Sequence, residues 1–432
     1  MKLFCIALCT LACFSCNQNV KEVAGPSLDQ LAEKYVRLGL AIGQYDPDFV
    51  DAYYGPDSLK PAGVQQVVFP KDSLLKEVYS LQSAVEKFIT ADKKDTLSRR
   101  ATWIASQLTA FGRRVRIFSG ELASFDEESR ELFGVVAPSF SESYFSSIVS
   151  QLDSLLPGKG DIPERFQALA SRFIIPKDKV DTVFKTAISV SRKRTLGYFD
   201  LPSSENFHLE YVTGKPWSGY NWYKGGFSSL IQLNTDNEIF IERVIDVASH
   251  ESYPGHHVYN MLLEKNLYRD KGWVEISLYP LFSPQSLIAE GSANYGIEMA
   301  FPGEEKNTLA KNVLLPLAGL DTTGISLYFK VLATKGKLNF VRNEVARGLI
   351  NQTMNEKEAL RWLTMYALNN EATALKSISF IHKYRSYVIN YNYGLELVKN
   401  YIEKGVQDND PVKKWALFGN LLSTEMIPSD LQ

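Results

Sequence analysis

Cysteine is confined to one end of this chain of 432 residues. All four cysteines lie within the first sixteen residues, at positions 5, 9, 13 and 16. The rest of the chain can therefore form no disulfide and offers no thiol nucleophile, and a metal ion there must be bound by His, Asp or Glu. The spacing Cys13-x-x-Cys16 is typical of redox and zinc motifs, but it falls where signal processing is expected, and we discount it.

Long hydrophobic runs and an excess of one charge are also lacking. After residue 16 no apolar segment is long enough to cross a bilayer. The formal net charge is −2, and no basic stripe is present, which argues against nucleic acid as a partner. Neither a Gly-x-Ser-x-Gly segment nor a P-loop occurs, which disfavours those two enzyme classes. Hydrophobic residues make up 45% of the chain and charged residues 22%, values typical of a globular protein with a full core.

The first sixteen residues form the exception. Lys2 precedes an apolar run over residues 3–14, which has the length of a signal-peptide core. A small residue before Cys16 and a polar segment after it resemble a bacterial lipoprotein processing site. We therefore expect a signal peptide over 1–16, lipidation at Cys16 and a tether over 17–26. The membrane is then a partner through the lipid anchor, and the protein lies in the bacterial cell envelope, facing the periplasm or the cell surface. A plain secretion signal is the alternative.

Helical periodicity covers most of the remaining chain. Ser27 and Gln30 have the spacing of a capping box at the start of an apolar helical stripe. The same periodicity recurs over Leu74–Phe88 and Thr96–Val115. Asn355-x-x-Glu358 resembles a second capping box.

The middle of the chain has a different pattern. Phe207–Val212 and Phe227–Leu233 are short, rich in strand-forming residues and bounded by turn residues, so they are predicted strands. The second could pair with an extended peptide if it lies at a sheet edge. Asn234–Asn237 then offers N-caps for a helix that has an apolar face and runs into His250.

These patterns predict a mainly α fold with a small β-sheet, of the α+β class. A single domain is expected over 27–432. Its first part, 27–200, is mainly helical, the segment 201–235 contains the strands, and 236–432 is again helical.

Histidine is scarce but clustered. The chain has five, at positions 208, 250, 256, 257 and 382, and three of them fall within eight residues, beside Glu251. A hydrolytic zinc site needs three protein ligands, an open position for water and a carboxylate that is not a ligand. His-Glu-x-x-His places two ligands one helical turn apart with the Glu as general base.

The spacing here departs from that motif, because Pro254 occupies the position four residues after His250. In an unbroken helix His256 would point about 120° away from His250, and His257 would lie about 10 Å along the axis. Pro removes a backbone donor and Gly tolerates strained geometry, so Pro254-Gly255 is expected to distort the helix. A two-residue bulge would bring His256 to where the second ligand normally lies; His257 is the alternative second ligand.

The segment from His250 to His257 reads His-Glu-Ser-Tyr-Pro-Gly-His-His. It closely resembles the His-Glu-x-x-Pro-Gly-His-His signature of a bacterial family called domain of unknown function 885, which belongs to the zincin-like metallopeptidase clan. The resemblance spans most of the chain after the leader. Supporting matches of lower specificity are Phe49–Pro56, Ser119–Glu121 with Phe125-Asp126, Lys215–Ser218, Asn234-Thr235 and Ala289–Gly291.

The resemblance implies a zincin-like metallopeptidase fold of the gluzincin type, in which a Glu on a later helix is the third ligand of one Zn²⁺ ion. Glu290 is the matching residue, on a helix that Ser283-Pro284 is expected to open. Asn294 lies on the same helix face, one turn on, and with Tyr295 is a candidate for contacting and orienting the ligands. A solvated helix face is the alternative interpretation.

The mechanism implied is hydrolysis of peptides outside the cytoplasm, with Glu251 as general base. Candidates for stabilising the oxyanion are His257, Tyr295 and the tyrosines of 384–393; Tyr391 and His257 are preferred. Tyr391 begins Tyr391-Asn-Tyr-Gly394, which resembles a Tyr-x-x-Gly segment of the family. Two alternatives stay open: a zinc hydrolase acting on another bond, and a lipid-anchored zinc-binding protein without turnover.

Three departures from the family leave the predicted metal ligands intact. Ser292 stands where the family has Trp, Tyr259 stands where Gln is common, and Leu314–Gly324 lacks the Arg-rich stretch that usually precedes Asp-Thr-Gly. These changes put the substrate preference in doubt.

Overall fold

The computed structural model describes residues 25–62, 68–92, 94–215 and 217–432. The predicted signal peptide, the lipidation site Cys16 and most of the predicted tether lie outside the described residues. Within the described ranges, no helix is both long enough and apolar enough to cross a membrane.

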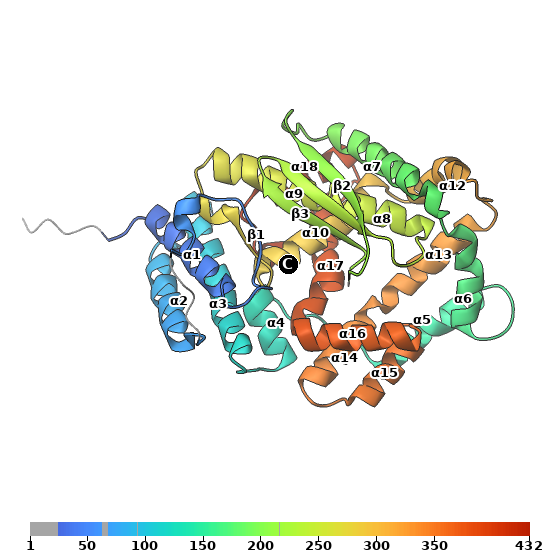
Figure 1. Ribbon diagram of the computed structural model, residues 1–432, viewed down its shortest axis with the longest axis horizontal. Helices are drawn as coiled ribbons and strands as arrows, with labels where there is room; N and C mark the ends of the chain where they lie inside the picture. Colours follow the sequence, from blue (N-terminus) through green and yellow to red (C-terminus); the bar gives the residue numbers. More distant parts are fainter. Residues whose placement is uncertain (1–24, 63–67, 93, 216) are drawn as a thin grey trace, which may run out of the picture.

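Helices form most of the molecule, and Figure 1 shows them surrounding a small sheet. The helices before the sheet are α1 (Leu28–Gly43), α2 (Lys71–Glu86), α3 (Thr96–Phe118), α4 (Phe125–Phe133), α5 (Glu142–Leu155), α6 (Ile162–Ala170) and α7 (Val180–Leu196). Those after it are α8 (Ile241–Glu251), α9 (His256–Leu263), α10 (Pro284–Ala300), α11 (Glu305–Leu309), α12 (Leu315–Ala318), α13 (Ile325–Gly336), α14 (Val341–Ile350), α15 (Glu356–Met365), α16 (Glu371–Tyr384), α17 (Ile389–Gly405) and α18 (Pro411–Ser423).

Local signals set several of the helix starts as predicted. Ser27 and Gln30 form a complete capping box at the start of α1. The side chain of Asn355 accepts a hydrogen bond from the backbone of Glu358 and caps α15, and Ser283 caps α10. Each of these caps satisfies a backbone donor that the first helical turn leaves unpaired.

The sheet has three strands in the order β2-β4-β3, namely β2 (Asn206–Val212), β3 (Gly219–Gly225) and β4 (Ser228–Asn234). β2 runs parallel to the central strand β4, and β3 runs antiparallel to it. The two predicted strands are confirmed within one residue. The second, β4, cannot take a peptide as an added strand, because it lies between β2 and β3, and the sequence did not reveal β3.

A second, two-stranded sheet joins distant parts of the chain. β1 (Val50–Tyr53) pairs antiparallel with β5 (Leu278–Pro280), so that a segment near the N-terminus is held beside the start of α10. The fold class predicted from the sequence, mainly helical with a small β component, is confirmed.

The start of α8 differs from the prediction. Phe240 occupies the N-cap position without a side-chain cap. The expected cap residues instead hold the turns beside the sheet: the side-chain amide of Asn234 donates to the carbonyls of Lys215 and Trp217, and Asp236 accepts from the backbone of Gly214. These side chains therefore fix the loop that leads into β3.

Helix α10 occupies the centre of the molecule and packs against α8, α9 and α17 (Figure 1). Its backbone touches that of α17, because a Cβ atom added at Gly291 would lie 2.4 Å from the carbonyl oxygen of Gly394. No side chain can move to relieve such a contact, since both partners are backbone. The pair of glycines therefore sets the distance between these two helices.

We expect Gly291→Ala to lower the free energy of unfolding by roughly 1–3 kcal/mol, because the added methyl group forces α10 and α17 apart. Gly336→Ala is the matched control, since a Cβ atom there meets nothing within 4 Å and alanine is the better helix former. Thermal and urea unfolding of the two variants measure the difference. Equal stability of Gly291→Ala and wild type would contradict the packing described.

Candidate metal site

The segment between α8 and α9 brings two histidines together. α8 ends at Glu251 and α9 begins at His256, with residues 252–255 between them. The backbone of Gly255 turns back to donate to the carbonyl of Ser249 at 3.1 Å, and a Cβ atom at position 255 would lie 1.9 Å from the carbonyl oxygen of His250. The predicted distortion at Pro254-Gly255 is confirmed, as a full break rather than a two-residue bulge.

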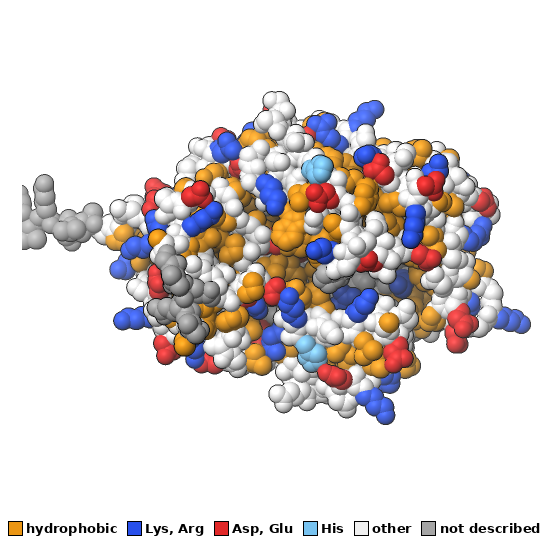
Figure 2. Space-filling model, in the orientation of Figure 1, with side chains coloured by type: hydrophobic (Ala, Val, Ile, Leu, Met, Phe, Trp, Pro, Cys, Tyr) orange, Lys and Arg blue, Asp and Glu red, His pale blue; other side chains and the backbone are white. Residues whose placement is uncertain are grey.

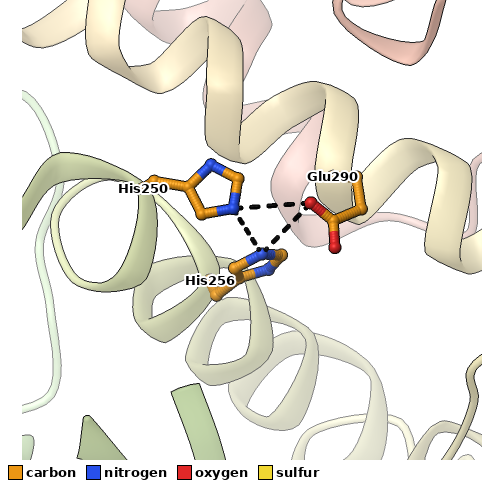
Figure 3. Close-up of side chains that lie close together, drawn as sticks. All are labelled: His250, His256 and Glu290. Carbon is orange, nitrogen blue, oxygen red and sulfur yellow. Dashed lines mark hydrogen bonds and ion pairs between the residues drawn. The ribbon is translucent and has the colours of Figure 1, made fainter. Parts of the chain in front are cut away.

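Three ligand-type atoms converge at this break, as Figure 3 shows. Nε2 of His250 lies 3.1 Å from Nε2 of His256. Oε2 of Glu290, from α10, lies 3.4 Å from the first of these nitrogens and 3.7 Å from the second. The structure thus brings together the three residues that the sequence predicted as metal ligands. His256, rather than His257, stands beside His250.

The geometry fits a tetrahedral ion. Ligand atoms about 2.0–2.1 Å from a tetrahedral zinc ion lie roughly 3.3 Å from one another, close to the three distances observed. Oε2 of Glu290 is buried and has no hydrogen-bond partner, although a buried acceptor without a partner is costly. A cation at the centre of the cluster would satisfy all three atoms.

The charges of the site also favour a cation. Burial raises the pKa of Glu290, but His250 and His256 outweigh it and hold that pKa well below its ordinary value. Burial lowers the pKa of His256, yet Glu290 and then Glu251 raise it to about 9. The carboxylates therefore create a negative potential that either protons or a metal ion can neutralise.

Glu251, the last residue of α8, is buried and is not part of the cluster of three. Burial raises its pKa, while His250 and His256 act in the opposite direction. The backbone of β3 lies against its side chain: a Cβ atom at Gly219 would be 3.1 Å from Oε1 of Glu251. The first residue of β3 therefore leaves room for this carboxylate.

Two further residues support the ligands. Oδ1 of Asn294 lies 3.1 Å from Nδ1 of His250, so an Nδ1–H donor would leave Nε2 free for a metal. The hydroxyl of Tyr387 donates to Oε1 of Glu290 at 3.3 Å. The contact of Asn294 matches the orienting role predicted for it. Tyr387 is one of the tyrosines of 384–393 considered for the oxyanion, but its contact with a ligand was not predicted, because no motif links it to the histidines.

Asp51 lies near the site, and no role for it was predicted from the sequence. It lies on β1 and accepts a hydrogen bond from the hydroxyl of Tyr220 on β3. Burial raises its pKa to about 6, and the charges of His256, Glu290 and Glu251 act on it as well. The only signal in the sequence was its place in the matched segment Phe49–Pro56.

His257 does not face the cluster. It is fully buried, with Nδ1 2.8 Å from the hydroxyl of Ser229 and Nε2 3.1 Å from Oε2 of Glu205. The hydroxyl of Tyr253 donates to the same carboxylate oxygen at 2.5 Å. Both ring nitrogens are therefore engaged, and the predicted role of His257 toward the substrate is not supported. Its contacts with Ser229 and Glu205 instead fix the start of α9, next to the segment between α8 and α9.

Tyr295 also points away from the cluster. Its hydroxyl donates to Oε1 of Glu403 at 2.9 Å, and its ring packs against Phe418. Successive residues on a helix point about 100° apart, so Asn294 and Tyr295 cannot face the same ligand. The prediction that Tyr295 orients the metal ligands is therefore wrong. Its hydroxyl instead joins α10 to α17.

Tyr391, on α17, borders the site without touching the cluster of three. Its ring packs edge-on against Tyr387, and its backbone carbonyl accepts a hydrogen bond from Asn294 at 3.2 Å. The residue is 37% exposed. Burial, and then the charge of Glu290, raise the pKa of Tyr391 well above its ordinary value. The side chain is thus a neutral hydrogen-bond donor beside the site.

Comparison with known proteins shows the fold and little else. No protein-family model matches the chain, and no curated protein matches it in sequence. Among solved structures, a protein of Colwellia psychrerythraea described as a candidate lipoprotein is 14% identical, with a TM-score of 0.50 over 81% of this chain. This chain covers 66% of that protein, just under two thirds of its length. At such identity the likeness concerns the fold alone.

Two other solved structures have lower TM-scores. A candidate lipoprotein of unknown function from Shewanella oneidensis is 13% identical and has a TM-score of 0.48. The match covers 95% of this chain and 79% of that protein. The M32 carboxypeptidase of Deinococcus radiodurans R1 is 10% identical and has a TM-score of 0.46. The match covers 94% of this chain and 93% of that protein.

We expect the chain to bind one divalent transition-metal ion and His256→Ala to abolish that binding, because it removes one of three ligands. Asn294→Ala should weaken affinity about 10- to 100-fold, since the ring of His250 loses its partner. His208→Ala, a substitution of an exposed histidine on β2, is the control. Zn²⁺ titration by calorimetry and metal analysis measure these effects, and unchanged stoichiometry in His256→Ala would contradict the site.

Proposed function

We propose that this chain is a zinc-dependent hydrolase that cleaves peptides. The observation that carries the proposal is the cluster of His250, His256 and Glu290 at tetrahedral spacing, with the buried carboxylate of Glu251 beside it and outside it. Two imidazoles and one carboxylate are ligands that suit zinc. A purely structural site would need no such additional carboxylate.

A bound zinc ion supplies Lewis acidity toward a carbonyl oxygen and toward water. Glu251 accepts the proton of the attacking water on its carboxylate and passes it to the leaving amine. Because burial raises the pKa of Glu251, this carboxylate is a stronger base than an exposed one, which suits proton transfer near neutral pH. The contacts of Asn294 and Tyr387 hold His250 and Glu290 in position.

The edge of the sheet offers a place for the peptide. β3 is an edge strand of its sheet, and its first residue, Gly219, lies against the side chain of Glu251. An extended peptide that pairs with this end of β3 would pass beside the cluster. Tyr391 remains our candidate for stabilising the oxyanion, since its hydroxyl is protonated and its ring packs against Tyr387, which donates to Glu290.

The cellular setting is part of the proposal. Lipidation at Cys16 would anchor the protein in the cell envelope through the tether 17–26, with its substrates outside the cytoplasm. Membership of the domain of unknown function 885 family rests on the His250–His257 signature and on the supporting segments. The geometry of the cluster agrees with the ligand set that this family implies.

The test is peptide cleavage by the zinc-loaded protein and by its Glu251→Gln variant. We expect the variant to keep one zinc ion and to lose about 10²- to 10⁴-fold in kcat, the usual contribution of a general base. Glu242→Gln is the matched control. It changes another buried glutamate of α8, one that contacts Tyr328 away from the cluster, and should retain activity. Mass spectrometry of a peptide library identifies the products.

Two outcomes would overturn parts of the proposal. Zinc bound without Glu251-dependent peptide cleavage would exclude a peptidase and leave a hydrolase of another bond or a zinc-binding protein. If the protein binds no zinc after reconstitution, all three zinc-dependent functions are excluded: the peptidase, the hydrolase of another bond and the zinc-binding protein.

A further inference from the structure

A polar cavity of about 270 Å³ adjoins the proposed active site. It lies where the end of α13, the start of α14 and the start of α17 meet the loop between α15 and α16. Figure 2 shows that this face of the molecule is hollowed around the position of α17 in Figure 1. We call it the cation pocket, after the two basic residues among its lining residues Lys335, Asn339, Arg342, Asn369, Tyr391 and Asn392.

Its basic groups form no ion pair with any residue that the structure describes. Among the described residues Arg342 makes no hydrogen bond and no ion pair. Lys335 forms no ion pair within the described ranges, although the charge of Glu242 acts on it, and its ammonium lies 4.9 Å from the centre of the Phe166 ring. Both side chains are partly buried, and burial lowers the pKa of each. Burying a cation without a partner has a high desolvation cost. Such groups are therefore candidates for binding a ligand.

Several other basic residues of this region are paired. Arg385 contacts Glu128 through two nitrogens, Lys383 contacts Asp48, and Arg347 contacts Asp126 and Glu344. The amide of Asn369 in the cation pocket, in contrast, makes no side-chain hydrogen bond within the described part of the chain. Exposed lysines such as Lys337 also form no ion pair with the described residues, so what distinguishes Lys335 and Arg342 is that they are partly buried without one.

Tyr391 connects this pocket to the metal cluster. It lines the cavity, its backbone is bonded to Asn294, and Asn294 contacts His250. The charges of Glu290 and of Arg342 both act on its hydroxyl, in opposite directions. A ligand held by Arg342 would therefore share the lining residue Tyr391 with the surroundings of the proposed zinc site.

We propose that the cation pocket binds a carboxylate of the peptide substrate close to the bond that is cut. This inference rests on the proposed peptidase function and names its substrate class. A guanidinium presents paired N–H donors that match a carboxylate, and a lysine adds a second positive charge. The volume of the pocket is below the range of about 300–1,000 Å³ usual for ligand sites, so it suits the end of a peptide better than a continuous chain.

A peptide has two sources of such a group, its C-terminal carboxylate and the side chain of an acidic residue. Three forms of one peptide separate them: a free acid without acidic residues, its C-terminal amide, and an amide carrying Glu at the last position. We expect amidation to lower kcat/KM of the zinc-loaded protein roughly 10- to 100-fold, as the loss of a charged hydrogen bond implies. Recovery of the rate by the Glu-bearing amide would identify a side-chain carboxylate as sufficient.

The variant Arg342→Gln should remove most of the difference between acid and amide, and Arg342→Lys should retain part of it because the charge remains. Lys337→Gln is the matched control, since it removes an exposed charge two residues from Lys335 that does not line the pocket. It should discriminate between acid and amide as wild type does. Circular dichroism shows whether each variant is folded.

The outcomes distinguish this inference from the function on which it rests. Equal cleavage of all three peptides would overturn the carboxylate site and leave the peptidase standing. If no peptide is cleaved, the proposed function fails, and calorimetric binding of acid and amide to Glu251→Gln tests the pocket alone. Equal Kd values for the acid and the amide, or Kd values unchanged by Arg342→Gln, would overturn the proposed carboxylate site.

Discussion

Two imidazoles and a carboxylate face one another in a buried space, with Nε2 of His250 3.1 Å from Nε2 of His256 and Oε2 of Glu290 beside both. Such a group of acceptors is unfavourable unless a cation lies between them. The surrounding elements serve to hold it in place. α8 ends and α9 begins so that both rings point inward, and α10 supplies the carboxylate from the other side.

Close contacts at two glycines make that arrangement specific. Gly291 brings α10 against the backbone of α17, and a Cβ atom at Gly296 would lie 3.2 Å from the ring of Pro254 in the segment between α8 and α9. The helix that carries Glu290 is thus located from two sides. The bonds of Asn294 and Tyr387 then fix the ligands themselves, so the geometry of the cluster follows from packing as well as from hydrogen bonding.

Local patterns predicted much of this arrangement and failed where distant segments meet. Caps at Ser27, Ser283 and Asn355, two strands and the break at Gly255 all follow from neighbouring residues. β3, the β1–β5 pair and the roles of Asp51 and Tyr387 depend on contacts between parts of the chain far apart in sequence, which one sequence does not reveal. Where two candidates were adjacent, as His256 with His257 and Asn294 with Tyr295, only one of each pair can face the cluster, because neighbours on a helix point about 100° apart.

Position 255 also has a consequence for how the gene can vary. With a hypothetical Cβ atom 1.9 Å from the carbonyl oxygen of His250, every residue other than glycine collides with backbone there. The third base of a glycine codon is free to change, whereas any change at the first or second base replaces glycine. At exposed glycines such as Gly336 the space around the Cβ position is open. The codon for Gly255 therefore tolerates only silent mutation if the two histidines are to stay together.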